Sequence, residues 1–314
     1  MLRYIAHRLL IVVPLLFALS ILLFFYVHAV PGDPIAGMLG PAGTPELIAQ
    51  LRHERGLDRP LWDQYWDWMG GFLVGDFGIS LITGHDITPI VIDRIPATLQ
   101  LTIAGLIMII AIGFPLGYLA GKHKGGWLDR IFTPATLVGV SLPHFWVGTI
   151  LVLVLAVQLR WLPSGGYVPF VDNPWQSLRL TIMPALVLGI TLSPLMARLV
   201  RVATAQLQHE PFVVQARMRG LQSGTISRRY LLRNAVVPVV VIIGMQLGTL
   251  IGGQVIVEQL FNYPGLGRLL VEGATERDYL MVQSLTFLIA ILYVVINLIA
   301  EIVHAWLDPR VRLS

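Results

Sequence analysis

The chain has 314 residues, of which 55% are hydrophobic and only 13% charged, with a formal net charge of +4. Soluble domains carry roughly 25% charged residues, so this composition excludes an ordinary soluble globule and indicates a polytopic membrane protein. There is no cysteine, which excludes disulfides, thiolate nucleophiles and cysteine-ligated metals.

Six mainly apolar stretches are each long enough to cross a bilayer, which takes about 20 helical residues. They cover approximately residues 9–31, 96–121, 131–159, 180–200, 234–257 and 279–304. The first is too long for the apolar core of a signal peptide, so we take it as an uncleaved helix. With the N-terminus inside, short cytoplasmic segments hold 14 Lys and Arg and short outer loops hold 4. The positive-inside rule therefore predicts an N-in, C-in orientation.

Residues 32–95 form a long extracytoplasmic segment in this topology. Thr44 and Pro45 are typical of the start of a short helix that Gly56 would end, and a second helix is expected from Pro60 to the Gly70-Gly71 pair. On the second helix an aromatic face is predicted, composed of Trp62, Tyr65, Trp66 and Met69. We interpret it as an interfacial helix, and the alternative is a contact surface for an external partner protein.

Glycines recur at every fourth position in the second span (Gly113, Gly117, Gly121) and the fifth (Gly244, Gly248, Gly252). Such spacing favours close helix packing, either within this chain or against a second subunit.

The third span is interrupted near the expected bilayer midplane by Ser141, Pro143, His144 and Phe145. Proline frees backbone carbonyls, which a membrane tolerates only inside protein or beside a cavity. Gln246 of the fifth span lies at a similar depth. Because transporters commonly bind substrate at broken helices, these five residues are candidates for a translocation path. Structural hydrogen bonding between helices is the alternative.

A polar, arginine-rich loop within residues 205–233 separates the fourth and fifth spans. A basic cytoplasmic loop on an otherwise apolar protein suggests a docking surface, although its arginines could simply enforce topology.

Catalytic motifs are absent. The string from Gly117 to Lys122 is one residue too short for a phosphate-binding loop. Ser141 and His144 would need an acidic partner at their depth to form an intramembrane hydrolase, and the nearest carboxylate in sequence, Asp129, lies at the membrane edge. The spans carry no interior run of charged residues for ion coupling, which disfavours a self-contained secondary carrier or channel. We therefore expect no enzyme and no metal site, with energy supplied by a partner.

Several ordered motifs resemble one transporter family along essentially the whole chain. They are Pro31-Gly32-Asp33-Pro34, Gly75-Asp76-Phe77-Gly78, Arg94-x-Pro96-Ala97-Thr98-Leu99, Gly139-x-Ser141-x-Pro143, Glu258-x-x-Phe261-x-x-Pro264-Gly265-x-Gly267, Arg277-Asp278-Tyr279 and Asp308-Pro309-Arg310. With this set the chain resembles the permease subunits of peptide-type ABC importers, which handle dipeptides, oligopeptides, nickel, opines and glutathione. The long segment after the first span is similar to the dipeptide-permease B type.

The resemblance implies an ABC type I importer permease fold in a bacterial or archaeal inner membrane. It also implies a homologous second permease, two cytoplasmic ATPase subunits that use ATP and magnesium, and an extracytoplasmic substrate-binding protein. No cofactor is expected on this chain.

The 205–233 loop corresponds in that family to the "EAA" loop, whose short helix seats in the ATPase. Its implied coupling residues are Glu210, Ala216, Arg217, Arg219 and Gly220. The sequence departs from the family pattern at residues 211, 212, 214 and 215, which leaves the detailed polar contacts to the ATPase open. Peptides are the expected substrate from family frequency, and nothing in the spans identifies the ligand.

The segment from Glu258 to Arg268 is expected at the outer mouth. Asn262, Tyr263, Pro264 and Gly265 are candidates for a gate there, with a plain tight turn as the alternative.

Overall fold

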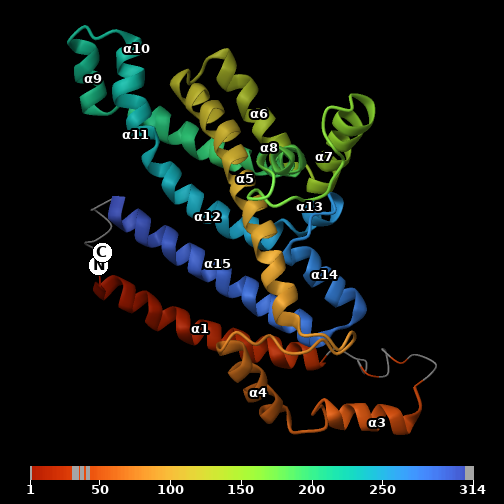
Figure 1. Cartoon of the computed structure of the whole chain (residues 1–314). Helices are drawn as coiled ribbons and strands as arrows, with labels where there is room; N and C mark the ends of the chain where they lie inside the picture. The colour runs from red at the N-terminus through yellow and green to blue at the C-terminus, as the bar shows by residue number, and fades with distance from the viewer. Residues whose placement is uncertain (1, 30–34, 36–38, 40–42, 308–314) are drawn as a thin grey trace. The chain divides into compact units, whose positions relative to one another are not determined.

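Helices make up most of the described part of the chain (Figure 1). The computed structural model describes residues 2–29, 35, 39 and 43–307, and within these ranges extended pairing is limited to one isolated bridge between Ile79 and Asp86. The all-helical expectation is confirmed. The motifs at residues 31–34 and 308–310 lie outside the described residues. Two compact units divide the chain, Met1–Thr98 with Pro264–Val294 and Leu99–Tyr263 with Val295–Ser314, and each is described by itself.

The first unit contains α1 (Leu2–Ala29), α3 (Pro45–Glu54), α4 (Leu61–Leu73), α14 (Leu266–Glu276) and parts of α5 (Ile87–Lys122) and α15 (Tyr279–Leu307). Helix α3 begins as predicted, because the Thr44 Oγ1 accepts a hydrogen bond of 3.3 Å from the Leu47 N–H. Gly56, with φ of +66°, follows its end. Helix α4 does not stop at Gly70-Gly71 but continues to Leu73, since Phe72 is buried in the core of the unit.

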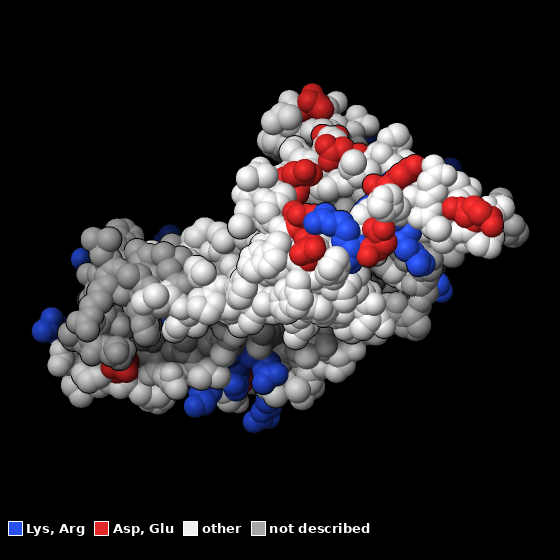
Figure 2. All heavy atoms as spheres, turned by 90° about the horizontal axis from the view of Figure 1, so that it is seen from below, with Lys and Arg blue, Asp and Glu red and all other residues white. Residues whose placement is uncertain are grey.

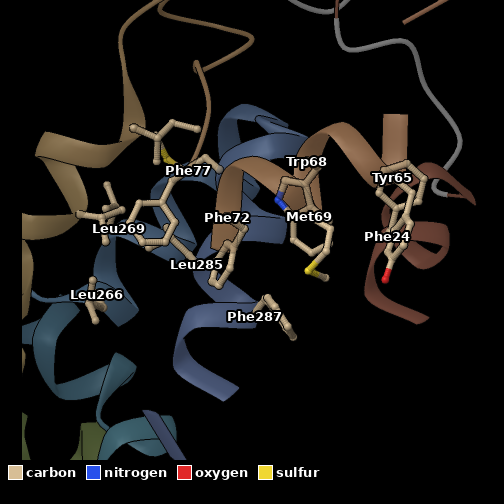
Figure 3. Packing of buried hydrophobic residues seen from close by; sticks show 13 residues of the cluster. Phe24, Tyr65, Trp68, Met69, Phe72, Phe77, Leu266, Leu269, Leu285 and Phe287 are labelled. Carbon is tan, nitrogen blue, oxygen red and sulfur yellow. The ribbon is translucent and has the colours of Figure 1, made fainter. Parts of the chain in front are cut away.

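An aromatic cluster forms the core of the first unit (Figure 3). Tyr65 and Met69 of the predicted face are buried there, and so is Trp68, which the face did not include. The Trp68 Nε1–H donates to Ser284 Oγ at 3.0 Å, and the Tyr65 hydroxyl lies 2.9 Å from Ser20 Oγ. The rings of the cluster meet mostly tilted or edge to face, an arrangement that contributes about 0.5–1.5 kcal/mol per pair.

The two remaining aromatic residues of that face, Trp62 and Trp66, are about half exposed but contact Phe25 and Phe17 of α1, with ring centroids 5.2 and 6.3 Å apart. The predicted face is therefore largely occupied within the unit, because α4 packs along α1 and α15.

The second unit contains the rest of α5 and α15 together with α6 (Trp127–Ser141), α7 (His144–Leu151), η2 (Val152–Gln158) and α8 (Pro174–Leu207). It also includes a set of shorter helices between α8 and the boundary of the unit. These are α9 (Pro211–Met218), α10 (Ser223–Thr225), η3 (Ile226–Leu232), α11 (Arg233–Ala235), α12 (Val237–Gly253) and α13 (Val255–Leu260).

Helix α8 is the most buried of the long helices and receives the glycine face of α5. A Cβ added to Gly113 would lie 2.9 Å from the Ser193 carbonyl oxygen, and one added to Gly117 would overlap the Ala197 backbone. The glycines of the second span therefore pack within this chain, since a side chain larger than a hydrogen atom would keep the α5 and α8 backbones apart. In the fifth span Gly244 faces Ala300, whereas no described atom lies within 4 Å of a Cβ at Gly252.

Four of the described helices are long and apolar enough to cross a membrane: residues 10–29 of α1, then α5, α8 and residues 279–302 of α15. The third predicted span is broken into α6 and the α7–η2 segment, which are bent by 99° and count as a fifth span if taken together. In the described part of the fifth predicted span, α12 contains the apolar stretch Ile242–Gly253, which is shorter than the four spanning helices. Six uninterrupted spanning helices are thus not seen in the described residues.

Candidate coupling hairpin and translocation path

The 205–233 loop folds into a helical hairpin of α9 followed by α10 and η3 (Figure 1). Glu210 is the N-cap residue of α9, and Pro211 occupies the first turn, where its missing N–H costs no hydrogen bond. At the other end Gly220 has φ of +75°. The Gly220 N–H donates to the Arg217 carbonyl at 2.9 Å and the Leu221 N–H to the Ala216 carbonyl at 3.2 Å. This is a Schellman ending, which requires a left-handed residue and favours glycine.

One face of α9 is buried and the other is exposed. Val213 and Ala216 are buried, and the Phe212 ring stacks with Tyr230 of η3 at a centroid separation of 6.5 Å. Met218 is 81% exposed, and Arg217 and Arg219 are also on the surface. The hairpin is therefore packed on its inner side and presents a basic, partly apolar surface outward.

Gln208 ties this hairpin to the end of α5. Its Nε2 donates to the Gly121 and Lys122 carbonyl oxygens at 2.7 and 3.1 Å, and its Oε1 accepts from Arg217 Nη2 at 3.2 Å. A second tie is the Tyr118 hydroxyl, 2.6 Å from Ser227 Oγ. The hairpin is therefore connected to α5 by Gln208 and by Tyr118.

An ion pair joins α6 to α8 near the same end of the unit. Arg201 forms a two-pronged interaction with Asp129, in which Nη2 lies 2.9 Å from Oδ2, and the Gly125 N–H donates to the same oxygen at 3.0 Å. Forked guanidinium–carboxylate pairs have a well-defined geometry, so α6 and α8 are held together here.

The break between α6 and α7 occurs where the sequence predicted an interruption. Ser141 ends α6 and His144 begins α7, with Pro143 as the N-cap residue. Ser141 and Phe145 are exposed, His144 is half-buried, and the Ser141 hydroxyl donates to the Leu137 carbonyl at 3.1 Å. Proline permits the sharp bend because it has no N–H to give to the preceding turn.

Gln246 lies apart from this exposed group. It is buried, and its Nε2 donates to the Leu192 carbonyl of α8 at 3.1 Å. This contact is the interhelical hydrogen bond that the sequence left as the alternative to a lining role.

The outer segment falls on the boundary of the two units. In the second unit, Asn262 is exposed with φ of +50° and Tyr263 is fully buried. The Tyr263 hydroxyl lies 2.9 Å from Gln100 Nε2 and 3.3 Å from Thr181 Oγ1, and burial raises the pKa of its phenol. In the first unit, Pro264 precedes Gly265, the N-cap residue of α14.

Gln100 also receives the Phe170 N–H at 3.2 Å and donates to Ser177, while the Gly166 N–H donates to the Phe261 carbonyl at 2.8 Å. The loop before α8 is thus attached to the Tyr263 corner. The sequence gives no sign of the roles of Gln100, Gln208 and Tyr118, because a single polar residue at a helix end or within a span has no local pattern that reveals its partner.

Among the described residues no three His, Asp or Glu side chains approach one another as a metal site would require. The apolar helices, the bent helix pair and the basic hairpin define a helical membrane transport subunit.

The chain belongs to the family of binding-protein-dependent transport system inner membrane components, whose model matches residues 113–313. The corresponding N-terminal model matches residues 1–102. The protein is a permease subunit of an ABC importer of the peptide, opine and nickel type, and it is not an enzyme. It resides in the bacterial inner membrane as a multi-pass protein.

Among curated proteins, the glutathione transport system permease protein GsiC of Escherichia coli is 35% identical over 312 residues, which cover 99% of each chain. GsiC of Shigella dysenteriae serotype 1 matches to the same extent. Two solved structures of the MetNI methionine ABC transporter in inward-facing conformations have a similar fold. The first has a TM-score of 0.57 at 19% identity and covers 70% of this chain and 96% of that chain. The second has a TM-score of 0.55 at 20% identity and covers 71% and 98%.

Proposed function

We propose that this permease carries peptides, in the di- to oligopeptide range, across the inner membrane by alternating access. The substrate class is supported by the 35% identity to a glutathione permease, since glutathione is itself a small peptide. The observation that carries the mechanism is the α9 hairpin, which exposes a basic surface and is connected to α5 through Gln208 and through the Tyr118–Ser227 contact.

The proposed topology has six spans with both termini in the cytoplasm, residues 32–95 outside and residues 205–233 inside. The distribution of Lys and Arg, 14 on the inner segments against 4 on the short outer loops, supports this orientation. In this topology the bent α6–α7 pair and the short α12 each contribute to one crossing, because neighbouring helices can satisfy their backbone groups.

The proposed partners are a homologous permease, two ATPase subunits inside that bind ATP and magnesium, and a substrate-binding protein outside. Glu210, Ala216, Arg217, Arg219 and Gly220 form the coupling surface. Closure of the ATPase subunits would move α9, and the Gln208 and Tyr118 contacts would pass that movement to α5.

The proposed path includes Ser141, Pro143, His144 and Phe145 at the helix break, where His144 is half-buried and the other three are exposed in this chain. Gln246 is retained in the proposal as a support for α8 beside the path, because its amide is engaged by Leu192. At the outer mouth Asn262 is the exposed gate candidate. Tyr263 would hold the corner in place, and Pro264 and Gly265 would lead into α14.

Reconstitution tests the proposal. The chain alone in liposomes should accumulate neither dialanine nor glutathione. The complete complex, with binding protein outside and ATP inside, should concentrate the peptide that its binding protein captures. Concentrative uptake by the chain alone would contradict an ATP-driven mechanism, and ATP-dependent import of nickel but of no peptide would contradict the substrate class.

A further inference from the structure

A cavity of about 440 Å³ lies within the first unit. Its wall comes from the end of α1, the connection between α3 and α4, α4 itself and the start of α15. We propose that this cavity binds a small molecule through a carboxylate group. The inference rests on the proposed topology only for placing the cavity outside the cell.

Two buried hydrogen-bonding groups in this wall have no partner among the described residues: the Tyr279 hydroxyl and the Gln283 Nε2. Gln283 is only 1% exposed. The two residues are four apart on α15 and so lie on the same face of the helix. Both groups can donate, and a buried donor without an acceptor is destabilising, so each requires an explanation. A ligand with acceptor oxygens would satisfy both once the two side chains, whose donor atoms are covered in the unliganded chain, turn toward the cavity.

The position of these donors is well defined. Asp278, immediately before α15, is fully buried and accepts hydrogen bonds from the Met281 and Leu81 N–H groups, both at 3.3 Å. The Ser80 hydroxyl also donates to Asp278. The first turn of α15 is therefore anchored to the loop that closes one side of the cavity.

The arginines of the wall favour an anion through the donors that they offer. The charged residues of the wall are Arg52, Arg55, Arg59, Asp67 and Asp76, and the buried Asp278 lies beside it, so the wall has no large net charge of its own. Arg59 pairs with Asp67, and Arg55 uses Nη1 to reach the Ser80 carbonyl at 3.1 Å. A guanidinium carries five donors in a fork that matches a carboxylate, so Arg55 has further donors to offer. Figure 2 shows acidic and basic side chains close together on one face of the molecule.

The wall also contains Gln64 and His28, together with the apolar side chains of Phe24, Leu57, Leu61, Trp68 and Leu280. Pockets of about 300–1,000 Å³ with mainly apolar walls and a few oriented polar groups are typical of small-molecule sites. The ligand is therefore a carboxylate with a small apolar body.

Binding of N-acetyl-dialanine, compared with its C-terminal amide, tests the proposal by calorimetry on the full chain in phosphatidylcholine nanodiscs. The acid should bind at least about tenfold more tightly than the amide. Tyr279→Phe and Gln283→Leu should each weaken binding of the acid by about tenfold, as expected for a hydrogen bond to a charged group. Neither variant should lower the melting temperature of the unliganded chain, because each removed donor has no partner there.

Tyr293→Phe is the matched control, since it makes the same change on the same helix outside the cavity wall and should leave binding unaltered. Equal binding of acid and amide, absence of binding to the parental chain, or parental affinity in both variants would overturn the proposal. Loss of binding in phosphatidylglycerol nanodiscs would assign the cavity to a lipid headgroup instead. Peptide import by the complete transporter is measured separately, so a failure here leaves the proposed function standing.

Discussion

Gly220 offers the sharpest test of the coupling hairpin, because a side chain at this position would strain the backbone but would not meet neighbouring atoms in the isolated chain. Its φ is +75°, and no described atom lies within 4 Å of a Cβ placed on it. Alanine would therefore fit but would be strained in the left-handed region by about 1–2 kcal/mol. Asparagine tolerates that region and should cost less. Tryptophan carries the same strain as alanine together with a bulky side chain, whose Cβ meets open space in the isolated chain.

A strain of about 1 kcal/mol shifts a conformational equilibrium roughly fivefold. Gly220→Asn should consequently behave much like the parent. Gly220→Ala should lower the ratio of peptide imported to ATP hydrolysed a few-fold. Gly220→Trp should match Gly220→Ala in the isolated chain but lose coupling far more severely in the complex, if α9 seats in a cleft of the ATPase.

The assay is the ratio of peptide imported to ATP hydrolysed in proteoliposomes, with expression level and elution profile as controls for membrane insertion. We expect the tryptophan variant to insert normally and to be uncoupled. Parental ATP hydrolysis and parental import by the Gly220→Trp complex would refute the reasoning.

Two further predictions concern packing and the outer mouth. Gly117→Leu should destabilise the isolated chain by about 1–3 kcal/mol, because its Cβ would overlap the Ala197 backbone, and this is measured as a lower melting temperature in detergent. Gly252→Leu, at an open position, is the control. Equal melting temperatures of the two variants would show that α5 and α8 do not pack as described. Asn262→Gly removes the exposed side chain while keeping a left-handed backbone, so it should reduce uptake at a parental expression level and elution profile. Undiminished uptake would leave the segment as a plain turn.

The helix ends near Thr44 and Gly220 could be predicted from the sequence because their causes are local. A side chain that accepts the first free N–H, or a glycine that adopts positive φ, acts on residues three to five positions away. The interruption at Pro143 is local in the same sense. The existence of long apolar helices follows equally directly from the length of apolar sequence that a bilayer requires.

The sequence by itself thus determined the all-helical class, the approximate positions of the apolar stretches and the residues that start and stop several helices. The tertiary structure decided which face meets which: that the glycines of α5 contact α8, that Gln208 reaches the end of α5, and that α4 buries Trp68 beside Ser284. These contacts join residues about 80 to more than 200 positions apart, and helix periodicity shows that a face is apolar or small without specifying its partner. The 99° bend has the same origin, since proline permits a bend whose direction and size depend on the packing of the surrounding helices.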